Sequence, residues 1–172
     1  MHPESFQNMK KCYAKRIAGS PLESRDPLTV LDVGGANING SYSEIFSGEN
    51  MRYLALDAQE GKGVDIVPED PYRFPLADGS MDIVISGQML EHCERFWLVF
   101  TEMVRVLKGD GWIFLIAPSA GPIHQHPVDC YRFYPDAYRA LAKYADCHLV
   151  DVWRDGRKPW NDLVGIFNKT GA

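Results

Sequence analysis

Short apolar runs that are rich in β-branched residues recur along the chain, and polar turns with glycine or proline separate them. The runs do not alternate with polar residues, which is typical of strands buried on both faces of a parallel sheet. Because each run is only a few residues long, strands are favoured over helices. We expect strands at residues 29–33, 52–56, 64–67, 82–86, 112–117, 148–153 and 163–167.

Segments with helical spacing of apolar residues lie among these runs. At the N-terminus this spacing predicts a helix over residues 4–18, with an apolar face made by Phe6, Met9, Tyr13 and Ile17. Similar patterns predict helices over residues 96–107 and 135–145. The connections between the first four strands are short, so any helices there are small.

The alternation of strands and helices predicts one α/β domain over residues 1–172, in which residues 1–28 form an N-terminal helix and loop. Gly156 and Pro159 lie between the last two strands, so these strands are expected to pair as a hairpin. No apolar run reaches the roughly 20 residues that span a bilayer, and the polar N-terminus lacks a signal-peptide core.

Composition narrows the class of protein further. A net charge of −5 argues against a general nucleic-acid binder, whose surface needs basic residues. The four cysteines include no Cys-x-x-Cys pair, so neither a zinc ribbon nor a disulfide framework is expected. Reduced thiols in a cytoplasmic protein are the simpler interpretation. The oligomeric state cannot be read from the sequence.

The first expected strand runs directly into a turn of small residues, Gly34-Gly35-Ala36-Asn37. Such a turn lets the backbone approach a ligand closely. The dinucleotide fingerprint Gly-x-Gly-x-x-Gly is not met, because Ala36 and Asn39 occupy its second and third glycine positions. Asp32, just before the glycines, is a candidate for holding a cationic ammonium or a water bound to one. Capping of the turn is the alternative role.

A second acidic residue, Asp57, ends the second apolar run 25 residues after Asp32. In Rossmann-like sites a carboxylate in this position bonds ribose hydroxyls. Aspartate at the end of a strand is also a common turn former. Its pairing with the glycine turn favours the ribose role.

Four motifs in order carry a family resemblance. They are Leu31-Asp32-Val33-Gly34, the segment Phe74-Pro75-Leu76-Ala77-Asp78-Gly79-Ser80-Met81-Asp82, then Leu90-Glu91-His92, and finally Arg105-Val106-Leu107-Lys108-Gly109-Asp110-Gly111. Together they resemble class I S-adenosylmethionine-dependent methyltransferases with a type 11 methyltransferase domain. The resemblance covers residues 29–168. It departs from the family at Ala36, where the loop usually reads Gly-x-Gly, and at Met81, where phenylalanine is usual.

This resemblance implies a Rossmann-like, seven-stranded, mostly parallel sheet of order 3-2-1-4-5-7-6, with the last strand antiparallel. It also implies methyl transfer from S-adenosylmethionine to a small-molecule, sugar or lipid-linked acceptor. The adenine amino group would meet Asp70, or Glu69 as the less favoured choice, and Asp57 would bond the ribose. The full set of expected cofactor-binding residues is Asp32, Gly34, Gly35, Ala36, Asn37, Asp57, Ala58, Asp70, Gly87, Gln88 and Met89.

A dense polar segment, residues 124–135, follows the fifth expected strand and should overhang the pocket. Similar segments occur in this methyltransferase group. We interpret it as a substrate lid, in which His126 or His124 acts as general base and Arg132 binds a carboxylate or phosphate. A structural loop is the main alternative. A metal site made by His124, His126 and Asp129 has ligands of suitable type but no recognised spacing, so no metal is expected.

Methyl transfer from a sulfonium mainly needs alignment of the acceptor and exclusion of water, so no covalent nucleophile is required. His92 is a third candidate base, although a structural role before the helix at residues 96–107 is favoured for it. Two other functions remain open. One is an NAD-dependent oxidoreductase, which the missing glycine fingerprint disfavours, and the other is a protein that binds the cofactor without transferring methyl.

Overall fold

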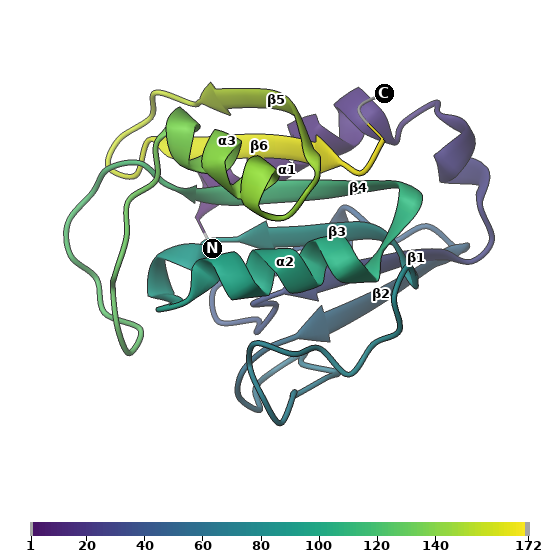
Figure 1. The fold of residues 1–172 in the computed structure, drawn as a ribbon, viewed down its shortest axis with the longest axis horizontal. Coiled ribbons are helices and arrows are strands. Elements are labelled where there is room, and N and C mark those ends of the chain that lie inside the picture. Colours follow the sequence, from purple (N-terminus) through teal and green to yellow (C-terminus); the bar gives the residue numbers. More distant parts are fainter. Residues whose placement is uncertain (1, 171–172) are drawn as a thin grey trace.

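The computed structural model describes residues 2–170 and shows a six-stranded sheet with helices on both faces (Figure 1). The strands are β1 (Leu28–Val33), β2 (Met51–Leu56), β3 (Met81–Gly87), β4 (Leu107–Pro118), β5 (His148–Arg154) and β6 (Asp162–Asn168). Their order is β2-β1-β3-β4-β6-β5; the first four pair in parallel, and β6 is antiparallel to both β4 and β5. The expected Rossmann-like arrangement and its antiparallel last strand are confirmed.

The prediction of a strand at residues 64–67 is wrong. Ile66 makes one isolated bridge with Leu56, and no ladder extends from it. The Asp65 carboxylate accepts a hydrogen bond from the Ala55 N–H at 2.8 Å, so a side chain replaces the backbone carbonyl that a ladder would supply. Pro68, which has no N–H to donate, follows shortly after. The sheet of the described chain therefore has six strands, and β2 forms one edge.

Three α-helices cover the sheet in the described chain. In Figure 1, α2 (Phe96–Val106) and α3 (Pro135–Tyr144) lie in front of the sheet, and α1 (Pro3–Arg16) lies behind it. These helices agree closely with the predicted ones. Three short 3₁₀ helices are η1 (Pro21–Ser24), η2 (Tyr42–Glu44) and η3 (Leu90–His92). Of these, η2 lies in the connections between the first four expected strands, where only small helices were predicted.

Alternate residues of the buried strands contribute to two separate apolar clusters. Leu31 of β1 belongs to the cluster that includes Phe100 of α2. Val30, the neighbouring residue, belongs to the cluster that includes Met9 of α1. Side chains of successive strand residues point to opposite faces, so an unbroken apolar run is what a sheet covered on both faces requires.

Two motif residues, Asp82 and Arg105, make structural contacts away from the strand ends that carry the glycine turn. Asp82, fully buried at the start of β3, accepts hydrogen bonds from the backbone and hydroxyl of Thr29 at 2.8 and 2.6 Å, and pairs with Lys108 at 2.9 Å. Arg105 donates to the carbonyl oxygens of Phe74 and Leu76. These structural contacts account for Asp82 and Arg105 in two of the motifs, and neither residue needs a role in ligand binding to explain its place there.

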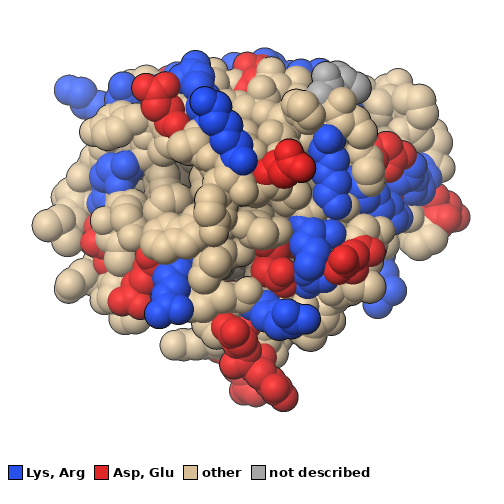
Figure 2. All heavy atoms as spheres, in the orientation of Figure 1, with Lys and Arg blue, Asp and Glu red and all other residues tan. Residues whose placement is uncertain are grey.

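Cationic and anionic side chains are interspersed over the face that carries α2 and α3 (Figure 2). Within residues 2–170, no helix is both long enough and apolar enough to cross a membrane.

Candidate functional site

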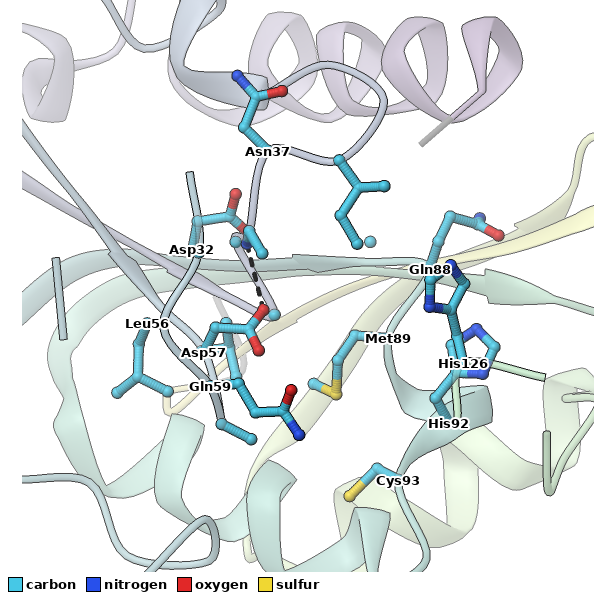
Figure 3. Close-up of a pocket in the computed structure, with 18 of the residues that line it drawn as sticks. Asp32, Asn37, Leu56, Asp57, Gln59, Gln88, Met89, His92, Cys93 and His126 are labelled. Carbon is cyan, nitrogen blue, oxygen red and sulfur yellow. Dashed lines mark hydrogen bonds between the residues drawn. The ribbon is translucent and has the colours of Figure 1, made fainter. Parts of the chain in front are cut away.

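A cavity of about 920 Å³ opens at the carboxyl ends of β1, β2 and β3. Open α/β sheets bind ligands at this edge, and the volume falls in the range of small-molecule sites. Met89 lies near the middle of the cavity in Figure 3, with Leu56, Asp57 and Gln59 on one side and His92 and His126 on the other. We call these the Asp57 side and the His92 side.

The glycine turn forms one wall of this cavity. Gly34 has a φ of +80°, a left-handed conformation that glycine adopts without strain. A Cβ there would lie 2.5 Å from Cβ of Met89, and a Cβ on Gly35 would lie 2.8 Å from Cβ of Ala55. The protein's own side chains therefore leave no room for a Cβ at either position. Ala36 and Asn37 also line the cavity.

Asp57 links the end of β2 to this turn. Its carboxylate accepts a hydrogen bond from the Ala36 N–H at 3.2 Å, and both Asp57 and Ala58 line the cavity. One oxygen of the carboxylate is engaged by this bond, and the group is positioned to accept hydrogen bonds from a diol. The arrangement suits the ribose role that the sequence predicts.

Asp32 is almost fully buried beneath the glycine turn and still borders the cavity. The Tyr53 hydroxyl donates a hydrogen bond to its Oδ2. Burial raises the pKa of Asp32 to about 7, although the bond from Tyr53 acts in the opposite direction. A cation bound nearby would favour the ionised carboxylate.

The end of β3 supplies the cavity floor. Gly87, Gln88 and Met89, three of the expected cofactor-binding residues, all line the cavity. A Cβ on Gly87 would lie 2.6 Å from Cζ of Tyr42, so glycine is needed for this tyrosine to pack. Gln88 has a φ of +61° and donates from Nε2 to Asp162 at 3.1 Å.

The loop after β4 brings its histidines to the cavity but not its arginine. His124 and His126 line the His92 side. Arg132 lies outside the cavity wall, and its guanidinium donates to both oxygens of Asp129 and to the carbonyl of Pro122. Both terminal nitrogens of Arg132 donate within the loop and the residue does not line the cavity, so its position favours the structural alternative over the expected role in binding an acceptor.

Asp70 also lies away from the cavity wall. Its carboxylate accepts a hydrogen bond from the Tyr72 N–H at 2.9 Å, which stabilises a local turn. Pro68, Pro71 and Tyr72 of this segment line the cavity instead. Neither Asp70 nor Glu69 lines the cavity, so neither carboxylate is placed for the expected contact with adenine.

The wall includes residues that were not among those predicted, and three of them are His2, Tyr42 and Trp160. His2 precedes α1 and stacks on Trp160 with ring centroids 6.3 Å apart, while Tyr42 lies in η2. Trp160 also lies 5.1 Å from the ring of His124, between centroids. All three come from segments remote from the recognised motifs, and no local pattern marks them.

Among residues 2–170, no group of three or more His, Cys, Asp or Glu side chains is placed to hold a metal ion. Burial lowers the pKa of His124, and the neighbouring His92 adds to the effect. The four cysteines are free thiols.

Comparison with known proteins identifies the family. The model of the methyltransferase domain family matches residues 39–115. An uncharacterized methyltransferase of Mycolicibacterium gilvum is 30% identical over 147 residues, which are 78% of this chain and 54% of that protein. Residues 39–115 belong to this methyltransferase domain family. The resemblance that the four motifs carry is thereby confirmed.

Solved structures agree with the methyltransferase fold. The 1,6-didemethyltoxoflavin-N1-methyltransferase of Burkholderia thailandensis, solved with 1,6-didemethyltoxoflavin and S-adenosylhomocysteine, superposes with a TM-score of 0.67. It is 18% identical, and the match covers 97% of this chain and 84% of that one. A SAM-dependent methyltransferase from Aquifex aeolicus gives a TM-score of 0.61 at 18% identity, with 97% of each chain covered.

This methyltransferase domain spans about half the length of the curated relatives it matches. The domain match therefore accounts for the fold and the family of the residues described.

Proposed function

We propose that this methyltransferase domain binds S-adenosylmethionine in the cavity and transfers its methyl group to a small acceptor. The observation that carries the proposal is the joint placement of the glycine turn after β1 and Asp57 after β2 on one wall. Ala36 and Asp57 are 21 residues apart in the sequence, and a hydrogen bond joins the Ala36 N–H to the Asp57 carboxylate.

The residues present fit this ligand. Asp57 would accept hydrogen bonds from the ribose hydroxyls. The left-handed turn at Gly34 would expose backbone to the methionine part, and the buried carboxylate of Asp32 lies close enough to the cavity to favour its ammonium group. The bound ligand supplies an electrophilic methyl on a sulfonium, so the protein chiefly has to align an acceptor and exclude water.

The His92 side of the cavity would hold the acceptor. It lies across Met89 from Asp57 (Figure 3), and the imidazoles of His124 and His126 line it. We further propose that the domain acts in the cytoplasm and not on nucleic acid, which its free thiols and acidic charge support.

Calorimetric titration with S-adenosylmethionine and, separately, with NAD tests the proposal. Binding of S-adenosylmethionine with one site per chain is expected, and NAD should give no saturable heat. Saturable binding of NAD alone would favour an oxidoreductase and overturn the proposal. If S-adenosylmethionine binds, formation of S-adenosylhomocysteine in the presence of an acceptor separates an enzyme from a protein that only binds.

A further inference from the structure

His92 is held in one orientation on the cavity wall. It ends η3, and its Nδ1 lies 2.6 Å from the carbonyl oxygen of Val128. A carbonyl oxygen can only accept, so Nδ1 carries the hydrogen of this bond. In a neutral imidazole the lone pair then resides on Nε2. His92 therefore has a defined basic nitrogen before any acceptor binds.

The basic nitrogen faces a buried carboxyl group. Nε2 of His92 lies 3.7 Å from Oε1 of Glu91, and Glu91 is 1% exposed. The other oxygen, Oε2, has no hydrogen-bond partner among residues 2–170. Burial raises the pKa of Glu91 to about 8, so near neutral pH the group beside Nε2 is mostly the uncharged carboxylic acid.

The other two histidines on this side are not held in one orientation by a hydrogen bond. No hydrogen bond to a ring nitrogen of His124 or His126 is found in the described chain, and both residues are exposed. Their rings lie 4.9 and 6.1 Å from that of His92, between centroids. The remaining charged groups nearby, Asp129 and Arg132, pair with each other.

The same side of the cavity has flat walls and no fixed cation. The imidazoles of His124 and His126 and the indole of Trp160 present ring faces and edges. Among the described residues that line the cavity, Lys62 is the basic one besides histidine, and its carbonyl bonds the Asn37 N–H beside the glycine turn. Planar rings stack on such walls, whereas a phosphate or carboxylate would lack a partner.

We propose that His92 is the general base of the methyl transfer and that the acceptor is a flat, uncharged aromatic or heteroaromatic molecule with an ionisable hydroxyl group. This inference rests on the proposed function. In the reaction, the hydroxyl proton passes to Nε2 of His92 as an oxygen lone pair attacks the methyl carbon. The carbon–sulfur bond breaks, its electron pair stays on sulfur, and the products are the methyl ether, S-adenosylhomocysteine and an imidazolium that later releases its proton to water.

Turnover with simple phenols tests both parts of the proposal. Catechol, 3-hydroxypyridine and 5-hydroxyindole serve as acceptors, and formation of S-adenosylhomocysteine and of the methyl ether is followed by mass spectrometry. The wild-type chain should methylate at least one of them. His92→Gln should lower kcat by about 10²- to 10⁴-fold, the usual contribution of a general base, while the Kd for S-adenosylmethionine changes less than twofold. His148→Gln, at the start of β5 and outside the cavity, is the matched control and should keep the wild-type kcat.

Nuclear magnetic resonance of the full chain with ¹⁵N-labelled histidine provides a test that does not depend on any acceptor. In the wild-type complex with S-adenosylhomocysteine, the ring signals lost in His92→Gln should be those of a neutral imidazole with hydrogen on Nδ1. A hydrogen on Nε2, unchanged kcat in His92→Gln, or no methylation of any of the three phenols by a chain that binds S-adenosylmethionine would each overturn the inference. Failure to bind S-adenosylmethionine at all would instead overturn the proposed function.

Discussion

The backbone N–H of Ala36 donates to the carboxylate of Asp57 at 3.2 Å, and this bond joins the turns that follow two neighbouring strands. β1 and β2 run in parallel and in register from Leu28 and Met51 to Val33 and Leu56, so both turns emerge at the same edge of the sheet. A binding site built across two strands follows directly from this register.

Replacement of Asp57 should weaken binding of S-adenosylmethionine. In Asp57→Ala the ribose loses a charged acceptor and the turn loses its bond to Ala36, so a loss of about 1–3 kcal/mol is expected. Titration calorimetry measures this change. Asp65→Ala is the control, because Asp65 lies outside the cavity wall and bonds the Ala55 N–H, and it should affect stability more than affinity. Equal affinity of Asp57→Ala and wild type would refute the ribose assignment.

Gly34→Ala should destabilise the fold because the added methyl meets Met89. Overpacking of this kind costs about 1–3 kcal/mol, in addition to the strain of a left-handed backbone. Gly19→Ala is a matched control, since Gly19 has a similar φ of +72° and no atom near the added Cβ. The difference between the two variants in the free energy of unfolding, measured by urea denaturation, isolates the clash. Identical losses would show that Met89 moves aside freely.

Arg132→Ala should destabilise the loop and not merely slow turnover. The Asp129 side chain is 2% exposed, and removal of its partner leaves a buried carboxylate that the guanidinium neutralised. A loss of about 1–3 kcal/mol in unfolding free energy is expected, and Asp129→Asn should lose a comparable amount. In a double-mutant cycle by thermal denaturation, the combined variant should lose less than the sum. Additive losses would indicate that the two residues act independently.

Several strands and helices could be predicted because their signals are local. The runs that became β1, β3 and β4 are mostly apolar, and burial of such runs is favourable. The fragment around Ile66 shares this composition, yet the Asp65 side chain takes the backbone's place in the pairing. Residue propensities do not show which acceptor a backbone N–H will bond to, so the prediction of a strand here was wrong.

The site residues also divide into those that the local sequence predicts and those that depend on tertiary contacts. Asp57 and the glycine turn follow predicted strands, and the parallel register brings them together. The environment of Arg132 depends on Asp129 and on the carbonyl of Pro122, contacts that form only when the loop folds. His2 and Trp160 reach the cavity from distant parts of the chain, and only the tertiary structure shows their contact.

Stability of the free domain should fall as pH rises from about 4 to 7, in part through Asp32. Burial raises the folded-state pKa of this carboxyl to about 7, above its unfolded value. A group with a raised folded pKa contributes its stability below the unfolded pKa and loses it as pH rises through the folded pKa. In Asp32→Asn the amide stays neutral, so the difference in unfolding free energy between wild type and variant should change over this interval. A pH-independent difference would show that Asp32 ionises normally.

A crystal structure of the complex with S-adenosylhomocysteine tests the central claim most directly. The account predicts the ribose hydroxyls within hydrogen-bond distance of Asp57, the amino-acid part beside Gly34, and the sulfur directed across Met89 toward His92. Clear density for the ligand elsewhere, or in this cavity with its sulfur turned away from the His92 side, would contradict it.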